Sequence, residues 1–306
     1  MTLKKLKIIL QTIIFLIVLT YIYFNIDLKD LRDLLNLIEL GTNSFLILFT
    51  FFIITLITNI FQALRWKYLI EHFNKKSNFY LYFKFITYSN LLSEISFIGI
   101  FSRAMIKLYS EIKVFNVLIT LFIEKIFSIY ILSLLCFVSL FILVENNILE
   151  FNILKNEIVF LFISLMILGP LILIKYKNLK IFSFFKKKDS IKKLFYFLDF
   201  KYFGLLIITT LIIQLLAIIN LCLVFQMFGL QINLLTMLLI LPIINFLISI
   251  PASITPWGWR EFIFLSILPL VGITNEESVL VSLTNAFLIL IIQFIFYLFY
   301  LIFFKK

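Results

Sequence analysis

Long apolar runs constrain this chain more than any other feature of its sequence. They lie at about residues 8–24, 43–64, 78–103, 114–144, 158–174, 203–228, 232–250 and 278–303. A helix needs about 20 predominantly apolar residues to cross the hydrocarbon core of a bilayer. Hydrophobic residues make up 63% of the chain and charged residues 14%, which leaves no stretch for a soluble catalytic domain. We therefore predict one all-α polytopic membrane domain over residues 1–306, with about eight hydrophobic segments.

Two of these regions are too polar or too irregular for a simple lipid-facing helix. Residues 78–103 include Asn90, Glu94 and Arg103, and residues 251–261 read Pro-Ala-Ser-Ile-Thr-Pro-Trp-Gly-Trp-Arg-Glu between two apolar stretches. Irregular backbone at membrane depth is tolerated only where it lines a cavity or packs against protein. Both regions are therefore candidate sites.

The 251–261 stretch also contains helix-start signals. Thr255 is suited to cap a helix, and Pro256 is suited to its first position, which would place Trp257 and Arg260 on one face. The free N–H groups and positive dipole end of such a helix, beside Arg260, predict an anion site. The alternative is an ordinary loop in which Trp257 and Trp259 anchor the interface and Arg260 reaches toward water.

Positive charge predicts which segments cross the membrane. If every segment crossed and the N-terminus were cytoplasmic, the lysine-rich residues 175–201 would fall outside, against the positive-inside rule. The conflict disappears if 78–103 enters and leaves on the cytoplasmic side and 232–272 on the outer side. This predicts six full spans, two re-entrant broken-helix hairpins in an inverted arrangement, and cytoplasmic termini. In the same reading, Arg65-Trp66-Lys67 end the second span at the interface, and the net charge of +11 implies no nucleic-acid partner.

The two hairpins also share a weak pattern. Placing Arg103 over Arg260 superposes Ser96 on Ser253, and Gly99 then falls on Pro256. Opposite insertion of two similar broken helices is the arrangement of inverted-repeat transporters. The alternative is a coincidence of two unrelated membrane breaks.

Several motifs occur in an order known from one membrane family. They are Arg65-Trp66, then Asn90, Ser96, Gly99 and Arg103, then Glu124-Lys125, and last Pro251, Ser253, Gly258, Arg260 and Glu261. With these residues the chain resembles the flippase-like family that includes the transmembrane region of lysylphosphatidylglycerol synthases and the UPF0104 membrane proteins. It departs from the family pattern at Glu94, Ile98, Thr255-Pro256 and Lys125. Two of these departures remove glycines, which permit close backbone approach to a ligand.

The resemblance implies lipid handling without lipid aminoacylation. We expect a lipid translocase that moves an anionic phospholipid or a polyprenyl-phosphate-linked lipid between leaflets of a bacterial or archaeal plasma membrane. Arg103, reached from the cytoplasm, and Arg260, reached from outside, would pair alternately with the phosphate. Glu94, Glu124 and Glu261 would hold the arginines in the empty site. The predicted substrate-binding residues are Asn90, Ser96, Arg103, Glu124, Ser253, Trp257, Arg260 and Glu261.

Other function classes remain open. The chain could be a membrane subunit or partner of a lipid-modifying enzyme for aminoacyl or glycosyl transfer, or a scaffold for a separately encoded one. An enzyme would need a group of acid/base residues or metal ligands. We interpret Asp27, Asp30 and Asp33 instead as the solvent-facing side of a helix on the membrane surface. The single histidine, His72, and the separated Cys136 and Cys222 offer no metal-ligand spacing. We therefore expect no enzymatic activity, no cofactor and no metal.

Amide side chains within the apolar segments allow two interpretations. They either line a groove or join helices by hydrogen bonds. The residues concerned are Asn59, Gln62, Gln214, Asn220, Asn245, Asn285 and Gln293.

Overall fold

The described part of the chain is helical throughout. The computed structural model describes residues 42–71, 78–95, 97–108, 114–145, 200–230, 233–250 and 256–303. In order, its elements are α3 (Thr42–Glu71), α4 (Phe79–Ile95), the 3-10 helix η1 (Phe97–Leu108), α5 (Val114–Glu145), α9 (Phe200–Met227), α10 (Leu234–Ile248), α11 (Trp259–Ile267), the 3-10 helix η3 (Leu268–Val271) and α12 (Asn275–Phe303). The predicted all-α class is confirmed.

Several sequence-based predictions fall outside these residues. They are the segments at 8–24 and 158–174, the surface helix that would carry Asp27, Asp30 and Asp33, most of the lysine-rich region, and the positions of Ser96, Ser253 and Thr255.

Among the described helices, four are long and apolar enough to cross a membrane. These candidate spans are Ser44–Glu71, Val114–Leu143, Phe203–Met227 and Asn275–Phe299, and they coincide with four of the predicted segments. One boundary was wrong. Helix α3 continues through Arg65-Trp66-Lys67 to Glu71, and Arg65 and Trp66 are 6% and 0% exposed. They lie inside the protein rather than at an interface because both find buried polar partners.

The remaining helices are shorter than a bilayer. Helix α4 has 17 residues and α10 has 15, which at 1.5 Å per residue gives lengths of about 26 and 22 Å. A hydrocarbon core of about 30 Å exceeds both. Each short helix packs against the element that follows it, α4 against η1 and α10 against α11. The two polar regions singled out in the sequence therefore form helical hairpins.

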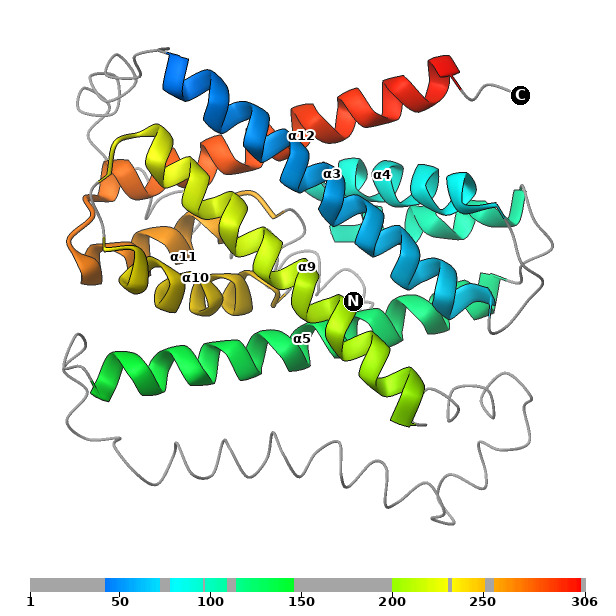
Figure 1. The fold of residues 1–306 in the computed structure, drawn as a ribbon, viewed down its shortest axis with the longest axis horizontal. Coiled ribbons are helices and arrows are strands. Elements are labelled where there is room, and N and C mark those ends of the chain that lie inside the picture. Colours follow the sequence, from blue (N-terminus) through cyan, green and yellow to red (C-terminus); the bar gives the residue numbers. More distant parts are fainter. Residues whose placement is uncertain are drawn as a thin grey trace, which may run out of the picture.

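The hairpins lie on opposite sides of the bundle (Figure 1). Helices α3 and α9 pack along each other and cross one face of the molecule, while α5 and α12 lie along opposite edges. The first hairpin packs through α4 against α12, and the second packs through α10 against α5. Each hairpin thus contacts the last long helix of the other half of the chain.

Gly99 allows η1 to pack closely against α4 within the first hairpin. A Cβ atom at this position would overlap the backbone of Leu92 and Ser93 in α4, so only glycine lets η1 pack this closely. In the structure the close approach is between two parts of the chain itself.

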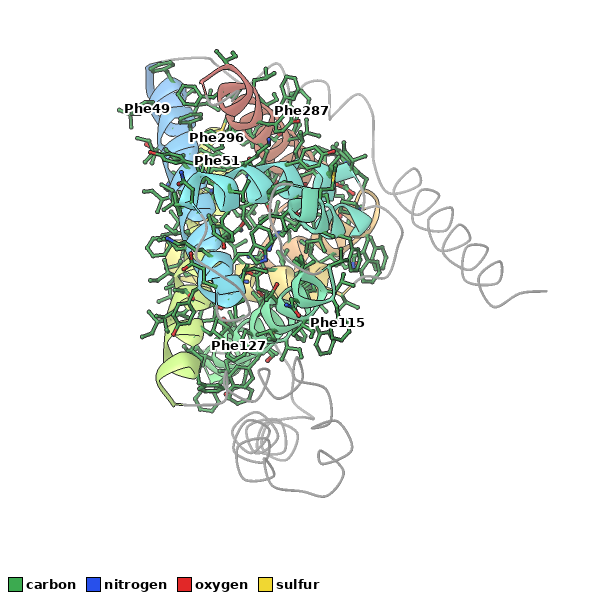
Figure 2. All side chains as sticks on the ribbon, turned by 90° about the vertical axis from the view of Figure 1, so that its right-hand side faces the viewer. Phe49, Phe51, Phe115, Phe127, Phe287 and Phe296 are labelled. Atoms are coloured by element: carbon green, nitrogen blue, oxygen red, sulfur yellow. The ribbon has the colours of Figure 1, made fainter. Side chains whose placement is uncertain are left out.

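The apolar residues divide into an interior and a lipid-type exterior. One core cluster surrounds Trp66, where α3, α4, η1 and α5 meet, and a larger one surrounds Phe225, mainly among α9, α10, α11 and α12. Large apolar side chains also project outward, such as Phe49, Phe115 and Phe287, which are 57%, 49% and 58% exposed (Figure 2). A water-facing surface rarely carries so many exposed apolar residues, whereas a bilayer requires them.

Candidate functional site

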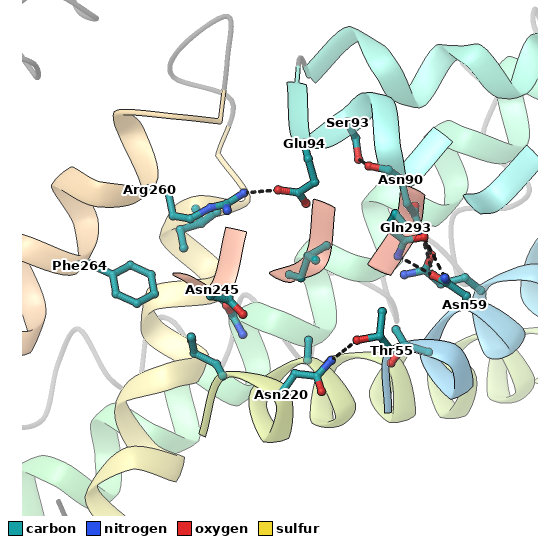
Figure 3. Close-up of a pocket in the computed structure, with 17 residues that line it drawn as sticks. Thr55, Asn59, Asn90, Ser93, Glu94, Asn220, Asn245, Arg260, Phe264 and Gln293 are labelled. Atoms are coloured by element: carbon teal, nitrogen blue, oxygen red, sulfur yellow. Dashed lines mark hydrogen bonds and ion pairs between the residues drawn. The ribbon is translucent and has the colours of Figure 1, made fainter. Parts of the chain in front are cut away.

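A polar cavity lies where the two halves of the chain meet (Figure 3). Its volume is about 320 Å³, and its walls come from α3, α4, α9, α10, α11 and α12. This volume is at the lower end of the range for small-molecule sites, about 300–1,000 Å³. Because every wall helix is apolar outside and polar here, the cavity is a polar compartment within an apolar bundle.

Amide side chains dominate the polar part of the lining. They are Asn59, Gln62, Asn90, Asn220, Asn245, Asn285 and Gln293. The two readings of the intramembrane amides are thus both correct, because these residues line a cavity and several also join helices. Gln214 is the exception among the amides singled out in the sequence, since it does not line this cavity.

Four of the amides form one hydrogen-bonded network. Asn59 and Gln293 donate to each other's side-chain oxygens, at 2.9 and 3.1 Å. Asn90 Nδ2 donates to Asn59 Oδ1 at 2.9 Å and to Gln62 Oε1 at 2.8 Å. The network therefore ties α3 to α4 and to α12, and it fixes one wall of the cavity.

Two further lining amides, Asn220 and Asn285, have unused acceptors. Asn220 Nδ2 donates to Thr55 Oγ1 at 3.1 Å. The Oδ1 atoms of Asn220 and Asn285 are buried and receive no hydrogen bond from the described residues. A buried polar atom without a partner costs about 1–3 kcal/mol, so water or a ligand in the cavity that donates to these oxygens stabilises them.

One ion pair stands at the edge of the cavity. Arg260 NH2 lies 2.8 Å from Glu94 Oε2, with the two side chains 10% and 16% exposed (Figure 3). The indole N–H of Trp257 donates to the backbone oxygen of Glu94 at 2.7 Å. These contacts join the end of α4 in one hairpin to the start of α11 in the other.

The start of α11 differs from the prediction. The helix begins at Trp259, and Gly258 occupies the N-cap position with a φ of 86°, a left-handed conformation that favours glycine. The N-cap and the first helical residue thus lie three positions after the predicted Thr255 and Pro256, and Thr255 itself is outside the described residues. Pro256 contributes instead a carbonyl that accepts from the backbone N–H of Arg260 at 3.2 Å.

Glu261 supports the helix rather than an arginine. One carboxylate oxygen accepts from the backbone N–H of Gly258, and the other accepts from the Ser282 hydroxyl at 3.2 Å. Arg260 pairs with Glu94 because adjacent residues of a helix point in different directions. The expected arginine-holding role is thus met by Glu94 and Glu124 and not by Glu261.

A second charged cluster is buried in the first half of the chain. Glu124 Oε1 lies 3.2 Å from Arg65 Nε, and its Oε2 lies 2.5 Å from Arg103 NH1. Arg65 NH1 also donates to Thr210 Oγ1 at 3.0 Å. One carboxylate therefore holds two arginines, and the cluster joins α3, η1, α5 and α9.

Arg103 has further partners that enclose its side chain. Its Nε donates to Ser89 Oγ at 3.3 Å, and its guanidinium carbon lies 5.5 Å from the ring centroid of Trp66. Trp66 is fixed in turn by donation from its Nε1 to Thr120 Oγ1 at 3.3 Å. Neither Arg103 nor Glu124 lines the polar cavity.

The sequence agrees with a known family over most of its length. Residues 8–296 match the family described as Lysylphosphatidylglycerol synthase TM region. The chain belongs to this family. The family takes its name from the membrane region of an enzyme that modifies a lipid, and this member is accordingly an integral membrane protein with a lipid-related role. Neither a curated protein nor a solved structure matches the chain.

In this family member, the predicted site residues separate into two places. Asn90 and Arg260 line the cavity, with Trp257 and Glu261 beside it at the start of α11. Arg103 and Glu124 belong to the buried cluster, so the two predicted phosphate-binding arginines do not share one compartment. Ser96 and Ser253 lie outside the described residues.

Arg65 is the buried charged residue that sequence reasoning misplaced. A signal for it was present, because Thr55, Asn59, Gln62 and Arg65 recur at spacings of four, three and three. That spacing marks one face of a helix. Interpreted as one polar face, these four residues would have placed Arg65 inside the protein, on the same side of α3 as the residues that line the cavity.

Proposed function

We propose that this protein is a lipid translocase that moves an anionic phospholipid or another phosphate-bearing lipid between leaflets. The headgroup would enter the polar cavity while the hydrocarbon chains stay in the bilayer. The observation that carries this proposal is the cavity itself, a compartment of amides with one arginine in a bundle whose outside is apolar. Membership in a family named for the membrane region of a lipid-modifying enzyme supports a lipid substrate.

Arg260 is the phosphate-binding residue in this proposal. A guanidinium has five N–H donors, and among the described residues the Arg260 side chain uses one, on Glu94. The others are free to bind phosphate oxygens, which arginine does with charge-assisted and often bidentate hydrogen bonds. Arg103 is already engaged by Glu124, Ser89 and Trp66, so it serves to fix the first hairpin.

The arrangement of helices supports alternating access. In each half of the described chain, short elements lie between two long helices: α4 and η1 lie between α3 and α5, and α10, α11 and η3 lie between α9 and α12. The contacts α4 to α12 and α10 to α5 are equivalent when the halves are exchanged. This exchange supports the proposal that the two short hairpins enter the membrane from opposite faces, as in the inverted repeats of transporters. Rocking of one half against the other would expose the Arg260 end of the cavity to each side in turn.

The test is lipid movement in vesicles of defined composition. Purified protein is reconstituted with a fluorescent, acyl-labelled phosphatidylglycerol, and dithionite bleaches only the outer leaflet. Wild type is expected to expose inner-leaflet probe, and Arg260→Gln to lower the rate at least about tenfold, because the phosphate loses its charged partner. The matched control is Lys125→Gln, which removes one cation from an exposed position on α5. A wild-type rate equal to that of empty vesicles would overturn the proposal.

A second candidate is that the cavity presents lipid to a separately encoded modifying enzyme. The family name is the observation that favours it. In that case wild type would bind the labelled lipid and lose binding in Arg260→Gln, yet bleaching would stop at the outer leaflet in all vesicles. The same preparation therefore separates the two functions.

A further inference from the structure

We propose that the Glu94–Arg260 ion pair is a latch between the tips of the two hairpins, which a phosphate-bearing anion opens by taking Arg260 from Glu94. The latch rests on the proposed function and adds the regulation of the same cavity. The observations behind it are the contacts that join the two halves of the described chain on either side of the cavity.

On one side of the cavity the halves are joined by a seam between α3 and α9. Asn220 Nδ2 donates to Thr55 Oγ1 at 3.1 Å. Arg65 NH1 donates to Thr210 Oγ1 at 3.0 Å. The second contact lies ten residues further along α3 and ten residues back along α9, so the helices run antiparallel and in register for about 15 Å. Helix packing along this length and two buried hydrogen bonds hold the seam closed.

The two hairpins meet only through their tips. Within the described part of the chain, no element of one hairpin packs extensively against an element of the other. Glu94 lies in the last turn of α4, and Arg260 lies in the first turn of α11. The Glu94 carboxylate accepts from Arg260 at 2.8 Å, and the Glu94 backbone oxygen accepts from the Trp257 indole at 2.7 Å. Both contacts therefore end on one residue of α4.

The latch and the seam lie on different sides of the cavity. Figure 3 shows the Glu94–Arg260 pair across the cavity from the Asn220–Thr55 pair, and all four residues line it. The seam joins long helices along their sides, whereas the latch joins two helix ends through side chains that are 10% and 16% exposed. The tips can therefore part while the seam stays closed, because far less packing has to break at the tips.

Charge gives the reason for the latch to open. Among the described residues that line the cavity, Glu94 and Arg260 are the charged ones. A phosphate bound to the Arg260 guanidinium would lie close to the Glu94 carboxylate, and like charges at short range repel each other. The phosphate therefore weakens the ion pair and releases the end of α4. Such coupling is reciprocal, so loss of the ion pair must strengthen anion binding by the same factor.

The latch links opening of the cavity to the presence of its ligand. In the lipid-free protein the Glu94 carboxylate occupies Arg260 and keeps the tips together. An arriving phosphate exchanges one anion for another at the same guanidinium, so Arg260 is not left without a counter-charge when the tips part.

The first test measures anion binding to the detergent-solubilised full chain. Short-chain phosphatidylglycerol is titrated by calorimetry into wild type and Glu94→Gln. The substitution is expected to lower Kd about fivefold, the equivalent of an ion pair of about 1 kcal/mol, because no carboxylate competes for Arg260. The matched control is Glu276→Gln, which removes the same charge from the first turn of α12, away from the cavity, and should leave Kd unchanged. Equal or weaker binding in Glu94→Gln would overturn the latch.

The second test measures the distance between the hairpin tips. Cys136 and Cys222 are replaced by alanine, and spin labels are placed on cysteines at Ile95, in α4, and Ser266, in α11, which are both exposed. The distance distribution should shift to longer values when short-chain phosphatidylglycerol is added, and in Glu94→Gln without lipid. A diacylglycerol of the same chain length, which has no phosphate, should leave it unchanged.

A second label pair serves as the control for the seam. Cysteines at Leu64, in α3, and Ile208, in α9, are 45% and 59% exposed in the native residues, and their distance should stay constant under every condition. A change across the seam with none between the tips would overturn the latch, as would identical tip distances in wild type and Glu94→Gln. Neither readout needs a lipid to cross the membrane. The latch is therefore tested even if the vesicle assay shows no translocation, and its failure leaves the translocase proposal standing.

Discussion

Arg103 and Arg260 each belong to the second element of a short hairpin, yet their surroundings differ. Arg103 shares Glu124 with Arg65, contacts Ser89 and lies over Trp66. Arg260 pairs with Glu94 at the edge of a cavity. The first arginine is enclosed by partners on three other elements, α3, α4 and α5, whereas the second has one side-chain partner among the described residues and keeps further donors for the cavity.

The difference shows how one residue type serves two purposes in a membrane protein. A buried charge is tolerated when it is paired and hydrogen-bonded, and removing one partner is strongly destabilising. An arginine with every direction occupied therefore holds helices together. An arginine with a single partner beside a cavity can exchange or add an anion. Substitutions at equivalent places in the two sites should accordingly change different properties.

The largest expected effect is at the shared carboxylate. Glu124→Gln leaves Arg65 and Arg103 together without a counter-charge, and it should lower the free energy of unfolding by about 3–5 kcal/mol. Glu94→Gln strands only Arg260 beside a polar cavity, so its loss should be about 1 kcal/mol. Thermal unfolding of the detergent-solubilised proteins measures both. Equal losses would remove the distinction between the two sites.

The next effect concerns the glycine that positions η1, and with it Arg103. Gly99→Ala places a Cβ in the backbone of α4, and overpacking of this kind costs about 1–3 kcal/mol. Gly204→Ala in α9 is the matched control, because a Cβ there meets nothing within 4 Å. It should stabilise the helix by about 0.5–1 kcal/mol. If both variants unfold at the wild-type temperature, η1 does not pack against α4 as described.

Exchange of arginine for lysine should separate stability from transport. Arg103→Lys cannot keep the contacts to Glu124, Ser89 and the Trp66 ring together, and we expect it to lose about 2 kcal/mol of stability. Arg260→Lys keeps a charge beside Glu94 and should change stability by less than about 1 kcal/mol, but it should slow lipid movement. The reverse pattern in unfolding and vesicle assays would exchange the roles assigned to the two residues.

The smallest expected effect comes from two threonines. Thr210→Val removes the hydroxyl that accepts from Arg65 NH1, at a cost of about 1 kcal/mol and with no change in the rate of lipid movement. Thr55→Val removes the acceptor that orients the cavity-lining Asn220, so it should slow lipid movement at a similar cost in stability. Unfolding temperature and the rate in vesicles distinguish the two variants. Slower lipid movement in Thr210→Val would tie the buried cluster to transport.

Much of the fold followed from local patterns. The helices at 114–145, 200–227 and 275–303 lie close to the predicted segments. The reason is that the length of an apolar run is a local property of the sequence, and it decides whether a helix can cross a bilayer. The two polar regions were also recognised as interruptions of the spans, since polar groups cannot face lipid, and in the structure they form short packed helices.

Local rules failed where a distant partner was decisive. Arg65 was read as the end of a span, but Glu124 and Thr210 keep it inside the bundle. The start of α11 was placed too early because Thr-Pro is a common opening, whereas Gly258 and the Glu261 carboxylate set the actual turn. The amides of the sequence allowed a groove or helix joints, and only their positions across several helices made them one cavity.

The sequence by itself determined that this is an all-helical membrane protein of its family, with two polar hairpins among long apolar helices. Hydrophobic run length and helical period act over neighbouring residues, so they can be read along the chain. The tertiary structure decided which carboxylate meets which arginine. Glu94 is 166 positions from Arg260 and Arg65 is 59 from Glu124, and no local pattern encodes such pairings. They arise because a buried charge is stable only where packing brings an opposite charge to it.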